Sequence, residues 1–239
     1  MLKIRNLTVS IDEEIVLKNL NLQVPDGQKV VLFGPNGSGK TSLFKTIIGL
    51  SKYQIKEGEI IFYDQSINNL NVNQRHDLGI AMMFQQPPKV EGVKLGEFVS
   101  QAFDLNGNLD TQAAKLKVKD FIEKGLNNGL SGGEQKRSEL FQLFVDKQAK
   151  FYLFDEPDSG VDLENMDLVG KIINQLLAEK SGLLITHTGD ILNYVQADLA
   201  YVMINGTIEC SGSPTSILNQ IKEQGYSECF GCQKEGPNE

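Results

Sequence analysis

Long apolar runs are missing from this chain, which argues against a membrane-spanning protein. No run reaches the roughly 18 residues that a transmembrane helix needs. Residues 1–11 alternate apolar and polar side chains as a strand does, and they lack the basic start and apolar middle of a signal peptide. We therefore expect a protein that stays in the cytoplasm and does not insert into a membrane.

Basic residues and cysteines are also scarce. The chain has 23 Lys and Arg against 31 Asp and Glu, a net charge of −8. It therefore lacks the positive charge that binding to a phosphate backbone requires, and we expect no nucleic-acid partner. Three cysteines in 239 residues do not make a disulfide framework and are typical of a reducing compartment.

The hydrophobic pattern that is present is that of an α/β protein. Alternating runs at 2–9 and 15–24 predict an antiparallel hairpin. The almost wholly apolar run at 28–33 predicts a strand buried on both faces, as in a parallel sheet. Further strands are expected at 59–63, 80–84, 151–154 and 183–186. A last hairpin is expected around Asn205-Gly206, between 199–204 and 207–210.

Apolar spacing and capping signals predict helices between these strands. The expected helices are 40–50, 95–103, 110–123, 131–145 and 162–179. Three consecutive helices fall within 87–150, where no comparable strand run occurs. We therefore predict a core formed by 1–86 and 151–222, an inserted helical subdomain at 87–150, and a tail at 223–239.

Residues 34–41, GPNGSGKT, fit the pattern G-x-x-x-x-G-K-[ST] between a predicted buried strand and a predicted helix. The glycines let backbone N–H groups turn towards phosphates, and the helix start adds the positive end of its dipole. Lys40 is expected to reach the terminal phosphates, and Thr41 to offer its hydroxyl to Mg²⁺. The motif predicts a site for ATP and Mg²⁺. The predicted binding residues are Gly34, Pro35, Asn36, Gly37, Ser38, Gly39, Lys40, Thr41 and Ser42.

Two carboxylates, Asp155 and Glu156, follow the predicted buried strand at 151–154. They should lie at the carboxyl edge of the sheet, where ligands bind in open α/β folds. Without a phosphate loop, two acids that merely solvate a strand end would be the ordinary interpretation. Beside a phosphate loop, Asp155 is expected to hold Mg²⁺, and Glu156 is expected to orient or deprotonate the attacking water. We therefore predict ATP hydrolysis.

The segment 130–135, LSGGEQ, resembles the signature of ABC (ATP-binding cassette) ATPases. On physical grounds alone it is a capped helix start, with Ser131 as N-cap and Glu134 three residues later. The resemblance implies the cassette fold: a phosphate-loop core with a mainly parallel sheet, an N-terminal antiparallel β subdomain and an inserted helical subdomain. It also implies a head-to-tail dimer with a second copy of the chain. In that dimer the segment would bind the second copy's ATP, through Ser131, Gly132, Gly133 and Glu134; many members have Gln at the last position.

Further matches extend the resemblance from about residue 2 to residue 226. Gln85 resembles the family's glutamine that contacts Mg²⁺ or water, and His187 resembles its histidine that contacts the γ-phosphate. Asp162 ends a segment similar to the loop that crosses the dimer interface, and we include it among the nucleotide-binding residues. The resemblance thus implies a catalytic set of Lys40, Gln85, Glu156 and His187, and Mg²⁺ ligands at Thr41, Gln85 and Asp155.

One feature of the family is missing from the first hairpin. Many members stack the adenine on an aromatic residue there, and the stretch from Val9 to Val16 contains none. We expect Ile11 or Val16 to supply an apolar contact instead. Because an apolar contact does not distinguish one base from another, we expect loose base selectivity.

Several segments are similar to the SufC-type ATPases, the ABC subunits of SUF iron–sulfur cluster assembly. They are 155–162 (DEPDSGVD, with Asp158 where transporter subunits have Thr), 84–87 (FQQP), 90–93 (VEGV) and 221–226 (IKEQGY). The resemblance implies a SufB-like scaffold protein as partner. The nucleotide-binding subunit of a membrane transporter shares every ATP motif and is the alternative. A DNA- or ribosome-linked ABC protein is disfavoured by the acidic charge.

Cys229 and Cys232 form a C-x-x-C pair in the polar tail. Two thiolates at this spacing can hold one side of a zinc or iron–sulfur site, and the other ligands must come from a second subunit. We hypothesise an iron–sulfur cluster or metal at such an interface. A pair of exposed thiols without metal is the alternative, and Cys210 is expected to be packed at a strand end.

Overall fold

Two β-sheets organise the chain, of which the computed structural model describes residues 1–105 and 107–226. The first sheet is antiparallel, with strand order β2-β1-β4-β5. Buried residues recur along its two longest strands, so one face packs on the core, and the predicted hairpin is confirmed. Its strands are β1 (Leu2–Ile11), β2 (Glu14–Val24), β4 (Gln54–Phe62) and β5 (Gln65–Ser66).

The second sheet has six strands in the order β10-β9-β3-β8-β7-β6. Neighbours from β9 to β6 pair in parallel, and β10 runs antiparallel to β9. The strands are β3 (Lys29–Phe33), β6 (Ile80–Met83), β7 (Phe151–Asp155), β8 (Ser181–Ile185), β9 (Leu199–Ile204) and β10 (Thr207–Gly212). The predicted fold class is confirmed: an α/β cassette with a mainly parallel sheet and an antiparallel β subdomain.

Both faces of the six-stranded sheet are covered, which explains the continuous apolar runs of its strands. Val30 and Leu32 of β3 lie in the core between the two sheets, together with Phe44 of α1 (Lys40–Ile47). Val31 and Phe33 lie in a separate core on the other face, under α7 (Pro214–Gln224). Alternate side chains of one strand therefore enter two different cores, and neither set can be polar.

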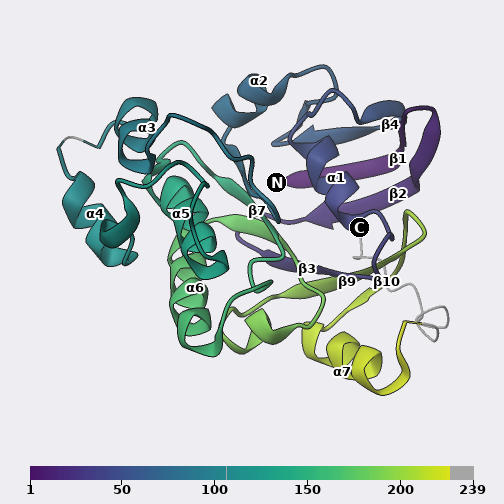
Figure 1. The fold of residues 1–239 in the computed structure, drawn as a ribbon. Helices are drawn as coiled ribbons and strands as arrows, with labels where there is room; N and C mark the ends of the chain where they lie inside the picture. Colours follow the sequence, from purple (N-terminus) through teal and green to yellow (C-terminus); the bar gives the residue numbers. More distant parts are fainter. Residues whose placement is uncertain (106, 227–239) are drawn as a thin grey trace.

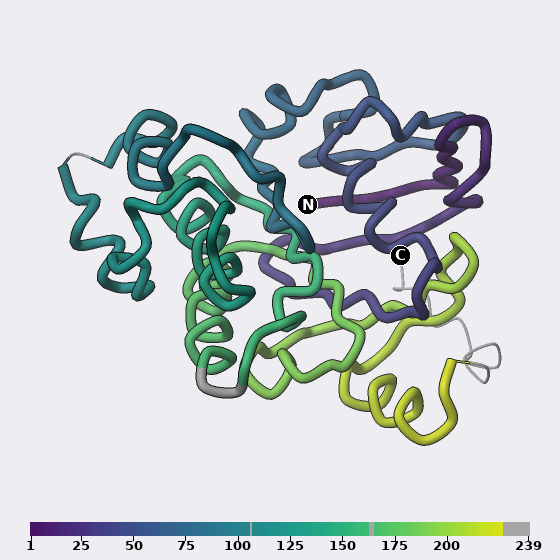
Figure 2. The backbone as a smooth tube through the Cα atoms, in the orientation of Figure 1, coloured from purple at the N-terminus to yellow at the C-terminus, as the bar shows by residue number. Residues whose placement is uncertain are grey.

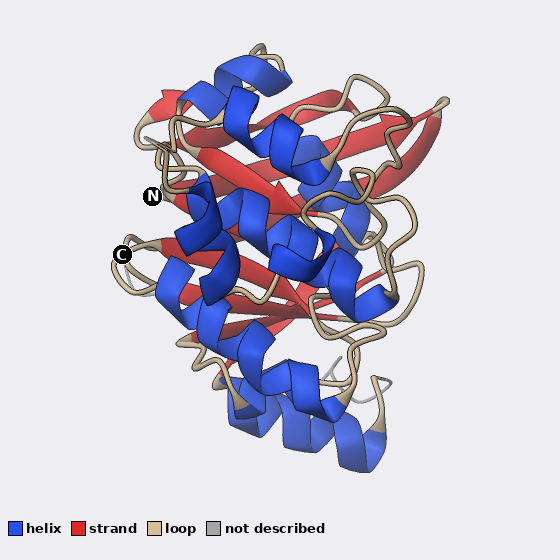
Figure 3. Ribbon diagram, turned by 60° about the vertical axis from the view of Figure 1, so that its left-hand side comes forward, coloured by secondary structure: helices blue, strands red, loops and turns tan. Residues whose placement is uncertain are grey.

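The remaining helices lie beside the sheet and beyond its β6 edge. α5 (Gly132–Val145) and α6 (Leu163–Leu176) share one core with β6 and β7, and α3 and α4 lie further out (Figure 1). Figure 3 shows the helices layered against the strands. Within the described ranges every helix is too short or too polar to span a bilayer. The others are α2 (Val72–Asp77), α3 (Leu95–Ala102), α4 (Leu109–Lys115) and two 3₁₀ turns, Lys119–Phe121 and Asp190–Asn193.

The predicted helix at 110–123 is wrong in its length. α4 stops before Lys117, which adopts a left-handed conformation with φ of 52°, and the 3₁₀ turn follows. Val118 N–H donates to Ala113 O at 2.9 Å and closes the helix end. After this break in the helix, the side chain of Val118 is fully buried in the core. The apolar spacing of the segment continues through the break, so periodicity alone could not show it.

The C-terminal hairpin packs beside the N-terminal strands, although the two are far apart in sequence (Figure 2). Asn205 and Gly206 have φ of 49° and 83°, the positive values of the predicted two-residue turn. Lys18 N–H donates to Gly206 O at 2.9 Å, and Gly206 N–H donates to Ser38 O at 2.9 Å. The turn therefore joins β2 to the phosphate loop.

A buried arginine fixes the end of α1. Arg75 of α2 is 3% exposed, and its guanidinium donates to the carbonyl oxygens of Thr46 and Ile47 at 2.7 and 2.9 Å. It also donates to the carbonyls of Leu70 and Asn68. Burial lowers the pKa of Arg75 to about 10. These bonds join the last turn of α1 to the segment that precedes α2.

Replacing Arg75 with Met should lower the free energy of unfolding by about 3 kcal/mol, because several buried carbonyls lose their donor. Urea denaturation followed by circular dichroism measures the change. Arg5→Met is the matched control. Arg5 pairs with Glu59 at 3.6 Å and the side chains are 59% and 42% exposed, so the control should lose less than about 0.5 kcal/mol. Equal losses in both variants would contradict the role of Arg75.

Candidate active site

Four neighbouring parallel strands bring the predicted site residues to one edge of the six-stranded sheet. The carboxyl ends of β3, β8, β7 and β6 lie side by side. Gly34 begins the phosphate loop directly after β3, and His187 follows β8. Asp155 ends β7 and precedes Glu156, and Gln85 comes two residues after β6. Segments from four parts of the sequence therefore meet at one edge.

The side chain of Lys40 lies inside the phosphate loop and is 5% exposed. Its Nζ donates to Gly34 O at 2.8 Å and to Pro35 O at 2.9 Å. Burial lowers the pKa of Lys40, while the nearby carboxylates of Glu156 and Asp155 act in the opposite direction. The ammonium group is thus directed into the loop, where phosphate oxygens would be stronger, charged acceptors than the carbonyls.

At two positions of the loop, nearby atoms leave no room for a side chain, so glycine is required. A Cβ on Gly34 would lie 2.2 Å from Met203 O of β9. Gly39 has φ of 104° at the N-cap of α1, and a Cβ there would lie 3.0 Å from side-chain atoms of Leu17 and Met203. Any side chain at Gly34 would therefore displace the backbone of β9. The loop follows a path that only glycine permits at these two positions.

Asp155 and Thr41 form a pair that fits a magnesium ion. Thr41 Oγ1 donates to Asp155 Oδ1 at 3.3 Å, whereas Asp155 Oδ2 is buried and has no hydrogen-bond partner within the described part of the chain. Burial raises the pKa of Asp155 to about 6. Hydroxyl and carboxylate oxygens are the ligands that Mg²⁺ takes. A buried acceptor without a donor is an atom that a bound cation would satisfy.

The carboxylate of Glu156 is held from two sides. Gln85 Nε2 donates to Glu156 Oε2 at 2.6 Å, and His187 Nε2 lies 2.5 Å from Glu156 Oε1. The backbone of Glu156 is left-handed, with φ of 50°, and its N–H donates to Ile185 O of β8 at 3.0 Å. The three predicted catalytic side chains, Gln85, Glu156 and His187, therefore lie together, and two of them hold the carboxylate of the third in place.

Asp158 bonds to the two threonines that flank His187 in the sequence. Thr186 Oγ1 donates to Asp158 Oδ2 at 2.6 Å, and Thr188 Oγ1 donates to the same oxygen at 3.3 Å. Gly189 N–H in turn donates to Thr186 Oγ1 at 3.0 Å. Because these two threonines flank His187, Asp158 fixes the loop that carries it. In the sequence Asp158 is only one residue of the SufC resemblance, since its threonine partners are distant along the chain.

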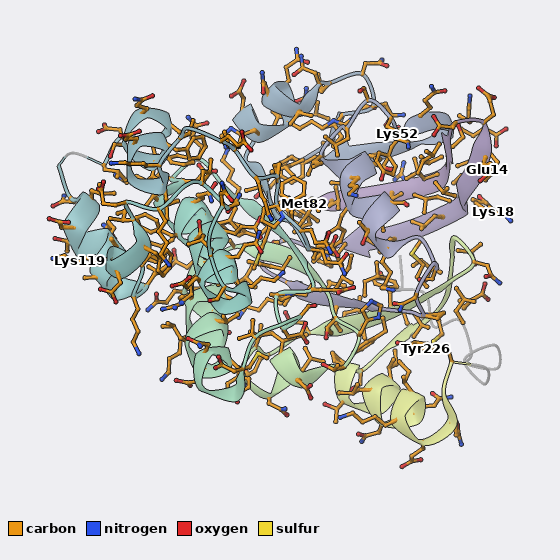
Figure 4. The ribbon with its side chains drawn as sticks, viewed as in Figure 1. Glu14, Lys18, Lys52, Met82, Lys119 and Tyr226 are labelled. Atoms are coloured by element: carbon orange, nitrogen blue, oxygen red, sulfur yellow. The ribbon has the colours of Figure 1, made fainter. Side chains whose placement is uncertain are left out.

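A cavity of about 710 Å³ runs from Glu156 along the phosphate loop to β2. Val16 lines its far end, whereas Ile11 is not among the described residues that line it, and the apolar contact with adenine stays a prediction. Ile15 and Lys18 of β2, which were not predicted, also lie there, and Figure 4 shows Lys18 at the right-hand edge of the molecule. The lining is Ile15, Val16, Lys18, Asn36, Gly37, Gly39, Lys40, Thr41, Ser42, Gln85, Glu156, His187, Asn205 and Gly206.

The signature segment lies outside this cavity. Ser131 caps α5: Glu134 N–H donates to Ser131 Oγ at 3.3 Å, and Ser131 N–H donates to Glu134 Oε2 at 2.9 Å. That backbone N–H lowers the pKa of Glu134. A Cβ on Gly132 would lie 3.0 Å from Gly160 O, and Gly133 faces Asn165. None of the four predicted signature residues is among the described residues lining the chain's own nucleotide cavity.

Asp162 is also outside the cavity. Its carboxylate is the N-cap of α6, where Oδ1 accepts a hydrogen bond from Asn165 N–H at 2.8 Å. The Asn165 side-chain amide donates to both carboxylate oxygens. A single chain therefore places Asp162 and the signature next to each other through Asn165, and away from its own phosphate loop.

The two tail cysteines, Cys229 and Cys232, lie outside the described residues, so the metal site there stays a prediction. Cys210 of β10 is 3% exposed, as expected of a packed residue. Among residues 1–105 and 107–226 there is no group of three or more His, Cys, Asp or Glu that could hold a metal ion by itself.

Comparison with known proteins assigns the family. The profile of the family described as ABC transporter matches residues 17–159. A probable ABC transporter ATP-binding protein of Streptococcus pyogenes serotype M3 is 35% identical over 245 residues, covering 95% of this chain and 94% of that protein. The probable ATP-dependent transporter ycf16 of Trieres chinensis is 34% identical over 243 residues, with coverages of 95% and 96%. The chain belongs to the ABC ATPase family, and the prediction that it is an ATPase is confirmed.

Solved structures share the fold over nearly the whole chain. A nucleotide-free ATP-binding cassette from an ABC transporter has a TM-score of 0.79 at 24% identity and covers 98% of this chain and 99% of its own. The dimeric post-hydrolysis state of the cassette MJ0796, bound to ADP and Pi, has a TM-score of 0.75 at 23% identity and covers 89% and 98%. This likeness shows that the chain has the fold of an ATP-binding cassette.

An aromatic residue at the far end of the cavity should tighten nucleotide binding. The Val16→Tyr variant should lower the KM for ATP roughly two- to tenfold, because a stacked aromatic pair contributes about 0.5–1.5 kcal/mol.

The wild type should use GTP with a kcat/KM within about fivefold of that for ATP, since its apolar contacts do not distinguish bases. Initial rates with both nucleotides measure this. Ile11→Tyr, outside the cavity, is the matched control and should change neither value.

Proposed function

We propose that this chain is a SufC-type ATPase: ATP closes two copies head to tail, and hydrolysis drives a conformational change in a SufB-like scaffold during iron–sulfur cluster assembly. The observation that carries the hydrolytic part is the Glu156 carboxylate held by Gln85 and His187 beside the phosphate loop. The assembly role is supported by the SufC-like segments, among them IKEQGY at 221–226. A cluster at Cys229 and Cys232 belongs to the same proposal.

The residues at the sheet edge divide the work of hydrolysis. Mg²⁺ held by Thr41 and Asp155 would supply positive charge next to the transferred phosphoryl group. Lys40 would exchange the carbonyls of its own loop for phosphate oxygens. Glu156 would accept the proton of the attacking water at a carboxylate oxygen, and His187 would keep that oxygen oriented. The contacts that each side chain already makes support its proposed role.

The position of the signature supports a dimer. Ser131 and its glycines lie outside the chain's own cavity, yet they offer a hydroxyl and a helix N-terminus, which suit a phosphate. Asp162 lies next to them through Asn165. A second copy would place these groups opposite the phosphate loop of the first. Hydrolysis would then depend on dimerisation, because the γ-phosphate lacks these donors in a single chain.

A second cavity, beside Gln85, is the proposed docking surface for the scaffold. It measures about 380 Å³ and lies between the core and the helices α3 and α5. Its lining is mainly apolar and includes Met82, which Figure 4 shows near the middle of the molecule. The apolar lining also contains Val72, Phe84, Pro87, Pro88, Val90, Phe98, Phe103 and Leu126. An apolar segment of the partner seated here would adjoin the residues that lead to Gln85.

The nucleotide-binding subunit of a membrane transporter is the second candidate. It is favoured by the names of two relatives, a probable ABC transporter ATP-binding protein and a probable ATP-dependent transporter, which share about a third of their residues with this chain. Both candidates use the same ATP chemistry. They differ in the protein that occupies the cavity beside Gln85.

Purification of the native complex, with mass spectrometry of its companions, separates the two candidates. The recovered companion is then mixed with the purified chain, and ATP turnover is measured. A SufB-like scaffold without membrane spans that raises turnover supports the assembly role. A membrane-spanning permease that does so would overturn it in favour of the transporter.

Glu156→Gln should trap the ATP-bound dimer, because the variant keeps the grip on phosphate but loses the proton acceptor. Gel filtration at saturating Mg-ATP, with the partner present, should show a stable dimer and turnover should fall at least about 100-fold. Glu57→Gln, an exposed residue of β4, is the matched control and should behave as wild type. A Glu156→Gln variant that stays monomeric under these conditions contradicts the dimer.

A further inference from the structure

Two buried side chains of α5 bind the backbone of the segment that carries Gln85. Phe84 N–H donates to Glu139 Oε1 at 3.0 Å, and Lys136 Nζ donates to Gln85 O at 3.2 Å. Lys136 and Glu139 are 4% and 5% exposed, and they stand three residues apart, on one face of the helix. They therefore hold two adjacent residues at two points.

These bonds begin where the sheet stops supporting the chain. β6 ends at Met83, which pairs with Phe154 of β7. From Phe84 onwards the backbone no longer pairs with β7. Side chains of α5 bond the backbone of Phe84 and Gln85 instead. Gln85 is the first residue after this point whose side chain reaches the hydrolytic centre, at 2.6 Å from Glu156.

Burying two ionisable groups in this position is costly unless they are bonded. Burial raises the pKa of Glu139 to about 8 and lowers the pKa of Lys136. Glu139 Oε2 has no hydrogen-bond partner within the described ranges. Neither residue is among the described residues lining the nucleotide cavity, so a contact with ATP does not account for them. Glu139 also lines the cavity beside Gln85, but what the two residues share is their bonding to the segment at 84–85.

We propose that Lys136 and Glu139 are positioning residues that hold the backbone at 84–85 so that Gln85 reaches Glu156. Because α5 begins next to Ser131, the same two bonds link the signature segment to the hydrolytic centre through one rigid helix. The proposal rests on the proposed ATPase function and deepens it. It names two residues that act on hydrolysis through Gln85 without contacting the nucleotide.

Glu139→Met removes the acceptor and keeps the size of the side chain, and Glu139→Gln keeps an acceptor oxygen. In Mg-ATP turnover assays, Glu139→Met should lower kcat roughly 10- to 100-fold with little change in KM, because the group beside Glu156 is misplaced. Glu139→Gln should restore most of the rate. Lys136→Met removes the second bond and should give the same loss of kcat, which provides a test if Glu139→Met does not fold.

A double-mutant cycle with Gln85→Ala separates positioning from packing. If Glu139 acts through Gln85, Glu139→Met should cause no further loss of kcat in the Gln85→Ala background. Ser138→Ala is the matched control, because Ser138 is fully buried on the same helix and its Oγ has no hydrogen-bond partner in the described chain. It should leave kcat unchanged. Urea denaturation shows which variants are folded.

The positioning role alone is overturned by a wild-type rate in Glu139→Met, or by losses from Glu139→Met and Gln85→Ala that multiply in the double variant. A wild-type rate in Gln85→Ala overturns it as well, since nothing would then act through Gln85. The failure of the proposed function is distinct. It would show as absent Mg-ATP turnover in the wild type, or as unchanged turnover in Glu156→Gln.

Discussion

The parallel pairing of β3, β8, β7 and β6 is the constraint on which the rest of the site depends. Parallel strands that are neighbours in a sheet end at the same edge, so the groups that follow them must meet. The phosphate loop, Asp155, Glu156 and His187 are assembled in this way from distant parts of the sequence. The apolar side chains that bury both faces of the sheet make this edge rigid. Packing in the apolar cores therefore determines the geometry of a polar site.

Charges buried at that edge give the site its chemistry. Lys40 donates to carbonyls of its own loop, and Asp155 keeps one oxygen without a partner in the described chain. Burial lowers the pKa of Lys40 and raises the pKa of Asp155, so it disfavours the charged form of each group. A phosphate beside Lys40 and a cation beside Asp155 would reverse these two pKa shifts, since a nearby opposite charge favours the ionised form. ATP and Mg²⁺ would thus bring charges opposite to those of Lys40 and Asp155.

Much of the fold and most of the site follow from local sequence patterns. The phosphate loop can be predicted because eight consecutive residues carry it. Glu156 can be predicted because it is one of two acids that end an apolar run. The break at Lys117 is not readable, since apolar spacing continues through it and tertiary packing of Val118 decides the conformation. Lys136 and Glu139 are not readable either. In a helix of mixed polarity nothing local distinguishes a solvated charge from one that reaches a distant backbone.

The sequence by itself determined the chemical groups of the protein and the strands and helices that carry them, because those depend on residue type and on spacing along the chain. Only the tertiary structure decided which groups meet. It places Gln85 against Glu156, keeps Ser131 out of the chain's own nucleotide cavity, and lines the far end of that cavity with Lys18. The physical reason is that these contacts join residues far apart in the chain, and their geometry follows from strand order and side-chain packing, which no local pattern records.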